Sequence, residues 1–245
     1  MSKSSREQRA ARAAEQLAAQ KKAERKRTIL AVGGVVVAMA IIIGGGVWLG
    51  LRGSSDDSSS SSTTTSAASS YGVSIGQKSA PHKVVIYEDF LCPYCDAFEN
   101  TSRDDLTKLA DAGKVYVDYR PFQLLSPDYS AEALNAFAVV RQAYPTGDVA
   151  KKFHDLLYEN QPSETGPFPE LSSLVDLAVK AGADKSKVEK GILDTSSQSD
   201  WVDGANQEAQ KAGVQGTPTI YLDGKIYQKG GSVEEMAQNL VKDLS

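Results

Sequence analysis

The chain has 245 residues, of which 41% are hydrophobic and 24% are charged, enough for one or two domains of ordinary size. Its 9 prolines, 20 glycines and 2 cysteines exclude a collagen-like chain and a small disulfide-dense scaffold. The net charge of −4 is unevenly distributed, because residues 1–28 are strongly basic and the remainder is acidic. This basic segment contains no aromatic residue, which argues against a nucleic-acid-binding surface.

Residues 29–51 form a run of 23 residues without a charge. As a helix the run would be about 34 Å long, enough to cross a hydrocarbon core of about 30 Å. It is longer than the apolar region of a cleaved signal peptide, so we expect an uncleaved signal-anchor with a single pass through the cell membrane. Lys and Arg gather on its N-terminal side, which predicts that residues 1–28 are cytoplasmic and that the C-terminal part is extracytoplasmic.

The next segment, residues 52–74, is rich in Ser and Thr. Between residues 53 and 70 the side chains are small and polar, with too little apolar area to offset the entropy lost on ordering. We therefore expect a disordered linker. Its root-mean-square span would be about 20–25 Å, which would keep a domain at 75–245 close to the membrane.

That domain begins with a strand pattern, a helix pattern and a second strand pattern. Residues 84–87 are β-branched and aromatic and indicate a buried strand. Pro93 suits the first position of a helix, and helical spacing continues from it to Gly113. Residues 115–119 alternate as a second strand. A right-handed crossover would make the two strands parallel.

Helical patterns then fill residues 127–213, which we interpret as an inserted helical subdomain. The expected helices cover residues 131–144, 149–159, 171–181, 185–194 and 200–212. The strand pattern returns at 219–222, and an Asp-Gly turn predicts a hairpin into 225–228. A capping-box pattern precedes a last helix over 233–244.

The two cysteines, Cys92 and Cys95, are three positions apart at the start of the first predicted helix. A structural disulfide is a poor explanation, because a bond that closes so small a loop removes little chain entropy. At a helix N-terminus Cys92 would face unpaired backbone N–H groups and the positive end of the helix dipole, which favour the thiolate. Cys95 would be shielded one turn further in. Such a pair suits disulfide exchange, and a low pKa at Cys92 would make its disulfide more oxidising.

A Cys-x-x-Cys motif is also half of a zinc site, which needs two further ligands. His82 and His154, the two histidines of the chain, are 72 residues apart, and neither has a ligand spacing. We therefore predict no metal. His82 is expected at the surface where a strand begins, and His154 at the edge of the core face of a helix.

The second candidate motif is Gly-Thr-Pro-Thr at 216–219. A proline that opens a strand is ordinarily an edge-strand or turn feature. If this loop faces the cysteines, a cis bond between Thr217 and Pro218 would turn the backbone of Thr217 toward an incoming extended peptide. Phe90 and Tyr94 are candidates for lining the same groove.

Together these motifs resemble the DsbA-like thioredoxin-fold oxidoreductases, above all the membrane-anchored members found in high-GC Gram-positive bacteria. The resemblance covers about 75–245 and rests on Cys-Pro-Tyr-Cys at 92–95, the segment 119–122, Phe-His-Asp-Leu-Leu-Tyr-Glu-Asn-Gln at 153–161, and 216–219. It implies an α/β thioredoxin-like fold with an inserted helical subdomain. It also implies that Cys92 is the attacking and attacked sulfur and Cys95 its resolving partner. The site-shaping residues would be Pro93, Tyr94, Thr217 and a cis Pro218.

The resemblance further implies that the redox-active disulfide replaces any cofactor. Substrates would be reduced exported proteins, and a membrane quinone reductase of the DsbB or vitamin K epoxide reductase-like type would reoxidise the pair. One position departs from the family pattern, because relatives commonly carry a buried acid six residues before the first cysteine, where this chain has Ile86. Glu88 shares the strand face of Ile86 and is a candidate proton acceptor for Cys95; the alternative for Glu88 is a solvated strand end.

The sequence thus predicts a membrane-tethered, extracytoplasmic thiol:disulfide oxidoreductase that introduces disulfides into exported proteins. Two alternatives stay open. The same fold could act as a reductase or isomerase supplied by a membrane electron donor. The chain could also be a non-catalytic envelope binding module with an inert disulfide or a metal site.

Overall fold

The structure is a computed structural model of the whole chain, and it describes residues 70–125 and 129–245. The expected cytoplasmic segment, the expected membrane helix and the expected linker up to residue 69 lie outside the described residues. Within the described ranges, no helix is long and apolar enough to cross a membrane.

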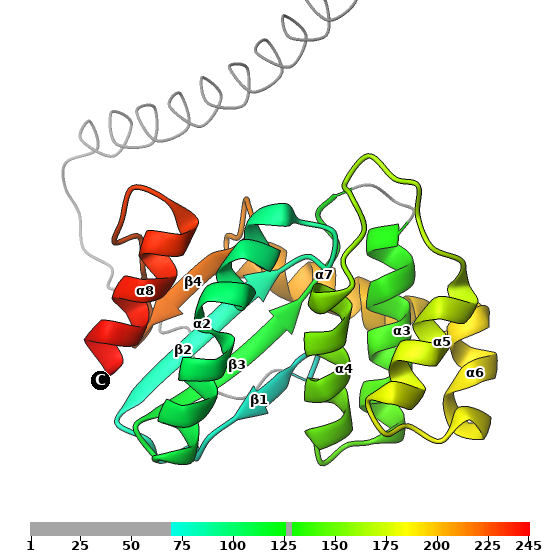
Figure 1. Cartoon of the computed structure of the whole chain (residues 1–245), viewed down its shortest axis with the longest axis horizontal. Coiled ribbons are helices and arrows are strands. Elements are labelled where there is room, and N and C mark those ends of the chain that lie inside the picture. Colours follow the sequence, from blue (N-terminus) through cyan, green and yellow to red (C-terminus); the bar gives the residue numbers. More distant parts are fainter. Residues whose placement is uncertain (1–69, 126–128) are drawn as a thin grey trace, which may run out of the picture. The chain divides into compact units, whose positions relative to one another are not determined.

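The described domain is built on one mixed sheet with the strand order β1-β3-β2-β4-β5 (Figure 1). The strands are β1 Val73–Ile75, β2 His82–Glu88, β3 Val115–Pro121, β4 Thr219–Leu222 and β5 Lys225–Ile226. The parallel pairing of β2 with β3 confirms the predicted strand–helix–strand unit. The antiparallel pair β4 and β5 confirms the predicted hairpin, although β5 is shorter than expected. All seven residues of β3 are buried, as expected for a strand covered on both faces.

The edge strand β1 is the one element that the sequence analysis did not predict. Its first two residues fall inside the segment 52–74 that was expected to be linker. It pairs antiparallel with β3, from Val73 opposite Tyr119 to Ile75 opposite Val117. Three residues are too few to show the alternation of apolar and polar side chains that predicts a strand. The strand forms because β3 would otherwise expose an unpaired edge. Gly72 permits this approach, since a Cβ there would lie 2.1 Å from the carbonyl oxygen of Tyr119.

Seven helices accompany the sheet within the described residues, and their ends agree with the predicted ranges to within about two residues. They are α2 Pro93–Asp111, α3 Tyr129–Ala143, α4 Asp148–Glu159, α5 Leu171–Lys180, α6 Lys185–Leu193, α7 Ser199–Lys211 and α8 Val233–Leu244. Helices α2 and α8 pack together on one side of the sheet, and α7 crosses its other side (Figure 1). Helix α4 packs against α2 and α3, and α5 and α6 pack on α3.

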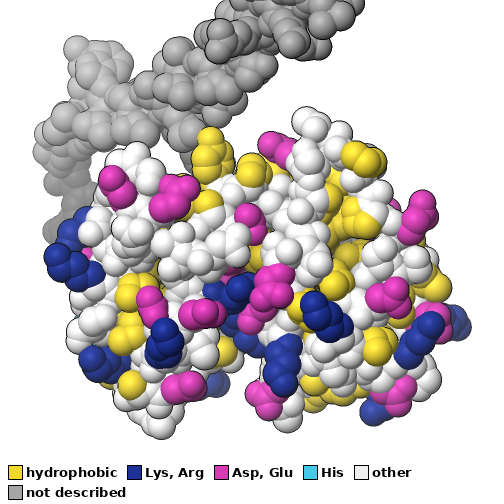
Figure 2. Space-filling model, viewed as in Figure 1, with side chains coloured by type: hydrophobic (Ala, Val, Ile, Leu, Met, Phe, Trp, Pro, Cys, Tyr) yellow, Lys and Arg dark blue, Asp and Glu magenta, His cyan; other side chains and the backbone are white. Residues whose placement is uncertain are grey.

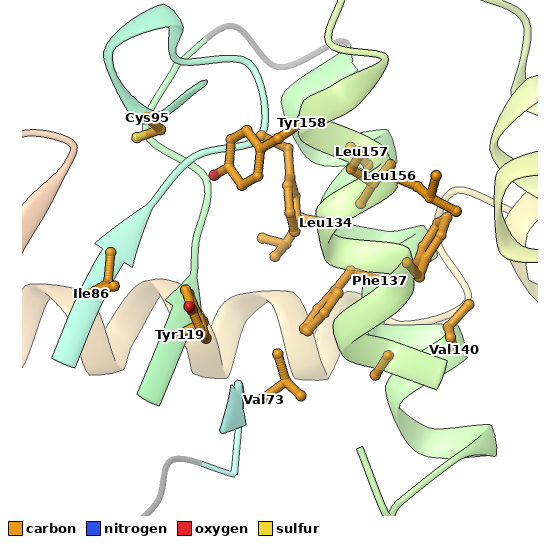
Figure 3. Close-up of a cluster of buried hydrophobic side chains, with 14 of the residues drawn as sticks. Val73, Ile86, Cys95, Tyr119, Leu134, Phe137, Val140, Leu156, Leu157 and Tyr158 are labelled. Atoms are coloured by element: carbon orange, nitrogen blue, oxygen red, sulfur yellow. The ribbon is translucent and has the colours of Figure 1, made fainter. Parts of the chain in front are cut away.

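The predicted insertion at 127–213 corresponds to α3–α7, but these helices do not form a separate core. One hydrophobic cluster runs from the sheet through α2 into α3 and α4, and it includes Tyr119, Phe137 and Tyr158 (Figure 3). Cys92 and Cys95 belong to the same cluster. The insertion therefore shares the core of the thioredoxin-like part and helps to bury the site.

Candidate active site

The two cysteines lie where β2 runs into α2. Cys92 is the N-cap residue of this helix and Pro93 is in its first turn, which confirms the predicted position. A proline loses no hydrogen bond there, because the first N–H groups of a helix have no partner inside it. The carbonyl oxygen of Cys92 accepts from the backbone N–H of Cys95 at 3.0 Å and of Asp96 at 3.1 Å. The helix geometry thus sets the spacing of the two thiols.

The two thiols are free, and their environments differ. Cys92 is 4% exposed and Cys95 is fully buried. A hydrogen bond with the Cys95 thiol lowers the pKa of Cys92 to about 7, against burial, which raises it. The backbone N–H groups of Tyr94 and Cys95 lower this pKa further, but less than the Cys95 thiol does. Burial raises the pKa of Cys95 well above 9. The first thiol therefore ionises near neutral pH while the second keeps its proton.

The loop before β4 meets this thiol. The bond between Thr217 and Pro218 is cis, as the sequence analysis expected. The Cys92 thiol donates to the carbonyl oxygen of Thr217 at 3.4 Å. In this reduced protein the carbonyl therefore faces the sulfur, whereas we expected the backbone of Thr217 to face an incoming peptide. The hydroxyl of Thr219 donates to the carbonyl oxygen of Gly216 at 2.6 Å and holds the loop.

The two aromatic residues proposed for a substrate groove have different positions. Tyr94 is 56% exposed beside Cys92, as a groove residue would be. The prediction for Phe90 is wrong: this ring is 1% exposed and packs with Phe137 and Tyr158 at centroid distances of 5.6 and 5.4 Å. The insertion covers Phe90, and the short local pattern around it does not show this.

Two residues that the sequence analysis missed hold the segment in front of α2. The amide of Gln161 donates to the carbonyl oxygens of Phe90 and Cys92, at 3.1 Å each. The carboxylate of Asp89 is buried and accepts from the backbone N–H of Leu124 at 2.7 Å and from the hydroxyl of Ser130 at 2.7 Å. Gln161 belongs to the quoted segment 153–161, but its partners come from a distant part of the chain.

Glu88 and His154 are buried together in the core, where the charge of Glu88 acts on Cys95. Glu88 is 0% exposed, so the alternative of a solvated strand end is wrong. Its Oε1 lies 2.6 Å from Nε2 of His154. His154 is also fully buried, so the prediction that it lies at the edge of a core face is wrong. Its position follows from the packing of α4 against α2, which turns this face of α4 inward.

A third buried ionisable residue, Glu99, completes the group and was also missed. It follows Cys95 by one helical turn, so the two residues share a face of α2. Burial, and then the negative charge of Glu88, raise the pKa of Glu99 to about 7. Burial lowers the pKa of His154, but Glu88 and the hydrogen bonds with Asp155 and Glu88 outweigh this and raise it to about 9. The cluster therefore holds one group that titrates near neutral pH and one that titrates above it.

This cluster does not fit a metal site. Glu99, His154 and Asp155 offer ligand atoms within 4.8 Å of one another, and this group, the one such set in the described ranges, contains neither cysteine. Both imidazole nitrogens are already held, by Glu88 and by Asp155. The ammonium group of Lys151 bonds the same oxygen of Asp155 and supplies the balancing positive charge. His82 does not belong to this group. It begins β2, is partly exposed as predicted, and its Nδ1 lies 3.0 Å from Oδ2 of Asp223.

A sheet of this topology, a Cys-x-x-Cys pair with unequal thiols at a helix N-terminus and a cis-proline loop beside them define a class. Proteins of this class exchange a disulfide between their own cysteines and those of another molecule.

Comparison with known proteins agrees with this class. The model of a family described as thioredoxin matches residues 68–243. The chain is 31% identical over 156 residues to the probable disulfide bond formation protein D of Bacillus cereus, covering 62% of this chain and 70% of that protein. In structure it is similar to the reduced disulfide bond oxidoreductase DsbG of Mycobacterium tuberculosis, with 28% identity and a TM-score of 0.59 over 71% of this chain and 85% of that one. Reduced DsbA of the same organism has 26% identity and a TM-score of 0.55, over 71% and 99% of the two chains. The chain belongs to the thioredoxin family and is a DsbA-like protein-disulfide oxidoreductase.

Proposed function

We propose that this protein is a membrane-tethered, extracytoplasmic oxidase that introduces disulfides into reduced exported proteins. The proposal rests on the unequal thiols: the pKa of Cys92 is lowered to about 7 while that of Cys95 is raised well above 9. The apolar run at 29–51 and a relative named for disulfide bond formation support the location and the direction.

The oxidation of one substrate takes two exchanges. A substrate thiolate attacks the sulfur of Cys92, the Cys92–Cys95 bond breaks, and Cys95 keeps the electron pair and takes up a proton. A second substrate thiolate then attacks the substrate sulfur of the mixed disulfide, and Cys92 leaves as a thiolate. Its pKa of about 7 makes it a good leaving group near neutral pH. The substrate gains one disulfide, and the protein is left as the dithiol.

The residues around the cysteines would position the substrate. The exposed ring of Tyr94 and the loop of Thr217 and Pro218 flank Cys92, and Pro93 fixes the start of the helix between the two thiols. No other cofactor is needed for these exchanges, because the redox-active disulfide carries the two electrons. Return to the disulfide requires an oxidant, and we propose a membrane quinone reductase of the DsbB or vitamin K epoxide reductase-like type.

The reduction potential tests the direction. A pKa of about 7 leaves Cys92 only partly ionised at pH 7, which stabilises the dithiol by less than about 1 kcal/mol, or less than about 20 mV. We therefore expect a potential between about −230 and −180 mV in glutathione buffers, as for glutaredoxins and protein disulfide isomerase, rather than about −120 mV. A value at or below about −270 mV, that of thioredoxin, would contradict the oxidase direction and favour a reductase.

Two cysteine variants test whether the site is catalytic at all. Cys92→Ser should abolish the oxidative refolding of a reduced substrate protein. Cys95→Ala should accumulate mixed disulfides through Cys92, from which the captured substrates can be identified. Unchanged refolding activity in Cys92→Ser would instead support the non-catalytic binding module.

The location can be tested with the same two residues, because the chain contains no other cysteine. After mild reduction of intact cells, a membrane-impermeant thiol reagent should label Cys92. Labelling that requires lysis would show that the site is cytoplasmic, and the proposed role would be wrong.

A further inference from the structure

The thiol of Cys92 is activated by hydrogen bonds. The Cys95 thiol lowers its pKa most, and Thr217 and the backbone N–H groups of Cys95 and Tyr94 add to this effect. Figure 2 agrees with this, since the Lys and Arg side chains visible on that face of the molecule lie away from the end at which α2 begins. A charge acts over several ångströms, whereas a hydrogen bond weakens steeply with distance and angle. The position of the Cys92 backbone therefore decides how reactive the sulfur is.

This sulfur belongs to a buried turn, residues 90–92, that connects β2 to α2. Buried backbone groups outside helices and strands need partners of their own. On one side, the carboxylate of Asp89 accepts from the N–H of Leu91 at 2.9 Å, and the carbonyl oxygen of Asp89 accepts from the N–H of Cys92 at 3.0 Å. On the other side, the side-chain amide of Gln161 donates to the carbonyl oxygens of Phe90 and Cys92 at 3.1 Å each. Asp89 and Gln161 thus hold the turn between them.

Gln161 reaches this turn from the inserted helices. It follows Asn160, the C-cap residue of α4, and its backbone N–H donates to the carbonyl oxygen of Tyr158 at 3.1 Å. Its position is therefore set by a packed helix, which holds a functional group more precisely than a loop does. The hydrogen bonds that begin α2 do not require it, because the carbonyl oxygen of Cys92 already accepts from the backbone N–H groups of Cys95 and Asp96. The amide of Gln161 instead fixes where the start of α2 lies relative to α4.

We propose that Gln161 is a positioning residue for Cys92, which keeps the two thiols aligned for disulfide exchange by holding the backbone of the turn. The inference rests on the exchange at Cys92 proposed above, and it applies whether the protein acts as an oxidase or as a reductase. Gln161 contacts the carbonyl groups of the turn, so it acts on the sulfur through the backbone. Without its amide, Phe90 and Cys92 lose this donor and the turn can shift. The contact between the thiols, and that between the Cys92 thiol and the carbonyl oxygen of Thr217, would then loosen.

The pH dependence of Cys92 alkylation in the full chain is the first test. Gln161→Met keeps an unbranched side chain of similar length but removes both N–H donors. In this variant the midpoint of alkylation should move from about 7 toward 9, because the hydrogen bond with the Cys95 thiol is the largest influence that lowers the pKa of Cys92. A variant that only lowered the stability of the fold would leave this midpoint near 7.

A single turnover of the reduced protein with oxidised glutathione is the second test. The Cys92 thiolate first attacks the glutathione disulfide, and one glutathione leaves as a thiolate. Cys95 then attacks the Cys92 sulfur, and the second glutathione leaves with the electron pair and takes up the proton that Cys95 loses. In Gln161→Met we expect this second step to slow by about tenfold to a hundredfold, the effect of misplacing a reacting group by about 1 Å. The first step, measured where Cys92 is fully ionised, should stay close to the wild-type rate, because it requires only the thiolate.

Asn160→Ala is the matched control, because this neighbouring amide donates to the carbonyl oxygen of Leu156 within its own helix, at 2.8 Å. It should lower stability without changing the alkylation midpoint or either step of the turnover. If Gln161→Met fails to fold, Gln161→Glu remains informative. It keeps the size and polarity of the side chain, but its carboxylate has no donor at neutral pH. The same shift of the midpoint and the same slow second step are expected.

Three results in a folded Gln161 variant would each overturn the positioning role: an alkylation midpoint that stays near 7, a second step at the wild-type rate, or an equal slowing of both steps. A failure of the oxidase proposal would differ from these. It would appear as a wild-type potential at or below that of thioredoxin, while the second step still depended on Gln161.

Discussion

The sheet carries a buried ionic cluster on each face, and the two clusters are built differently. On the α7 face, Arg120 donates to Asp118 at 2.8 and 2.9 Å, lies 3.3 Å from Glu208 and donates to the hydroxyl of Tyr87 at 2.9 Å. A guanidinium does not lose its charge in proteins, and its several donors hold fixed partners. This cluster therefore keeps one charge state over the whole physiological pH range.

On the face covered by α2 and α4, the cluster has a histidine in place of the arginine and an excess of acids. His154 and Glu99 have pKa values of about 9 and about 7, and both oxygens of Glu99 lack a partner within the described residues. Burying an ionised group costs free energy unless an opposite charge and further hydrogen bonds compensate for the lost water. The comparison teaches that a buried ion pair with a permanently charged guanidinium serves the structure. A buried cluster that titrates near neutral pH, one helical turn from the buried thiol of Cys95, indicates function instead.

The largest expected change in the free energy of unfolding comes from a variant that breaks the cluster on the α7 face. Arg120→Ala would leave Asp118 buried without its cation, and removing one partner of a buried pair typically costs about 3–5 kcal/mol. We expect that loss in the free energy of unfolding in urea at both pH 5 and pH 8. A loss below about 1 kcal/mol, or one confined to either pH, would show that this cluster is not the fixed one.

The second-largest expected effect is a gain in the free energy of unfolding, and it depends on pH. The folded state raises the pKa of Glu99 from 4.5 to about 7, so its contribution to stability is complete below about pH 4.5 and is lost as the pH rises through 7. Glu99→Gln removes the buried charge that the wild type carries above pH 7. The variant should be more stable than the wild type at pH 8, by up to about 3 kcal/mol, and close to it at pH 4.5. Urea unfolding at the two pH values measures this, and an equal difference at both would contradict it.

A third experiment separates the two partners of the titrating cluster. In Glu88→Gln the nearest carboxylate of His154 is lost, so burial should weigh more and lower the pKa of His154 from about 9. An NMR titration can follow this, because the chain has 2 histidines and His82→Gln identifies the other signal. An unchanged His154 titration would show that Asp155 alone keeps the imidazole charged.

The smallest expected change in the free energy of unfolding comes from Glu208, the second acidic partner of Arg120. The side chain of Glu208 is 29% exposed, and Arg120 keeps its two bonds to Asp118 without it. Glu208→Gln should therefore lower the free energy of unfolding by about 1 kcal/mol or less. A loss as large as that of Arg120→Ala would mean that Glu208, and not Asp118, anchors this cluster.

Much of the architecture is predictable from the sequence because it depends on neighbouring residues. The helix that begins after Cys92 follows from a proline at its first position and the apolar spacing behind it. The hairpin follows from Asp223 and Gly224, whose φ angles of 50° and 80° suit these two residue types. The motif at 92–95 and the cis bond at Pro218 were also expected, because local patterns and a family resemblance identify them.

Only the tertiary structure decided which ionisable groups meet. Glu88, Glu99 and His154 come from β2, α2 and α4, and their pKa values depend on burial and on distances between elements that no local periodicity contains. The same holds for β1, which is a strand because β3 offers it an edge, and for Phe90, which the inserted helices cover. Short-range patterns determine elements, whereas electrostatic interactions and desolvation act through space and are set only when those elements pack.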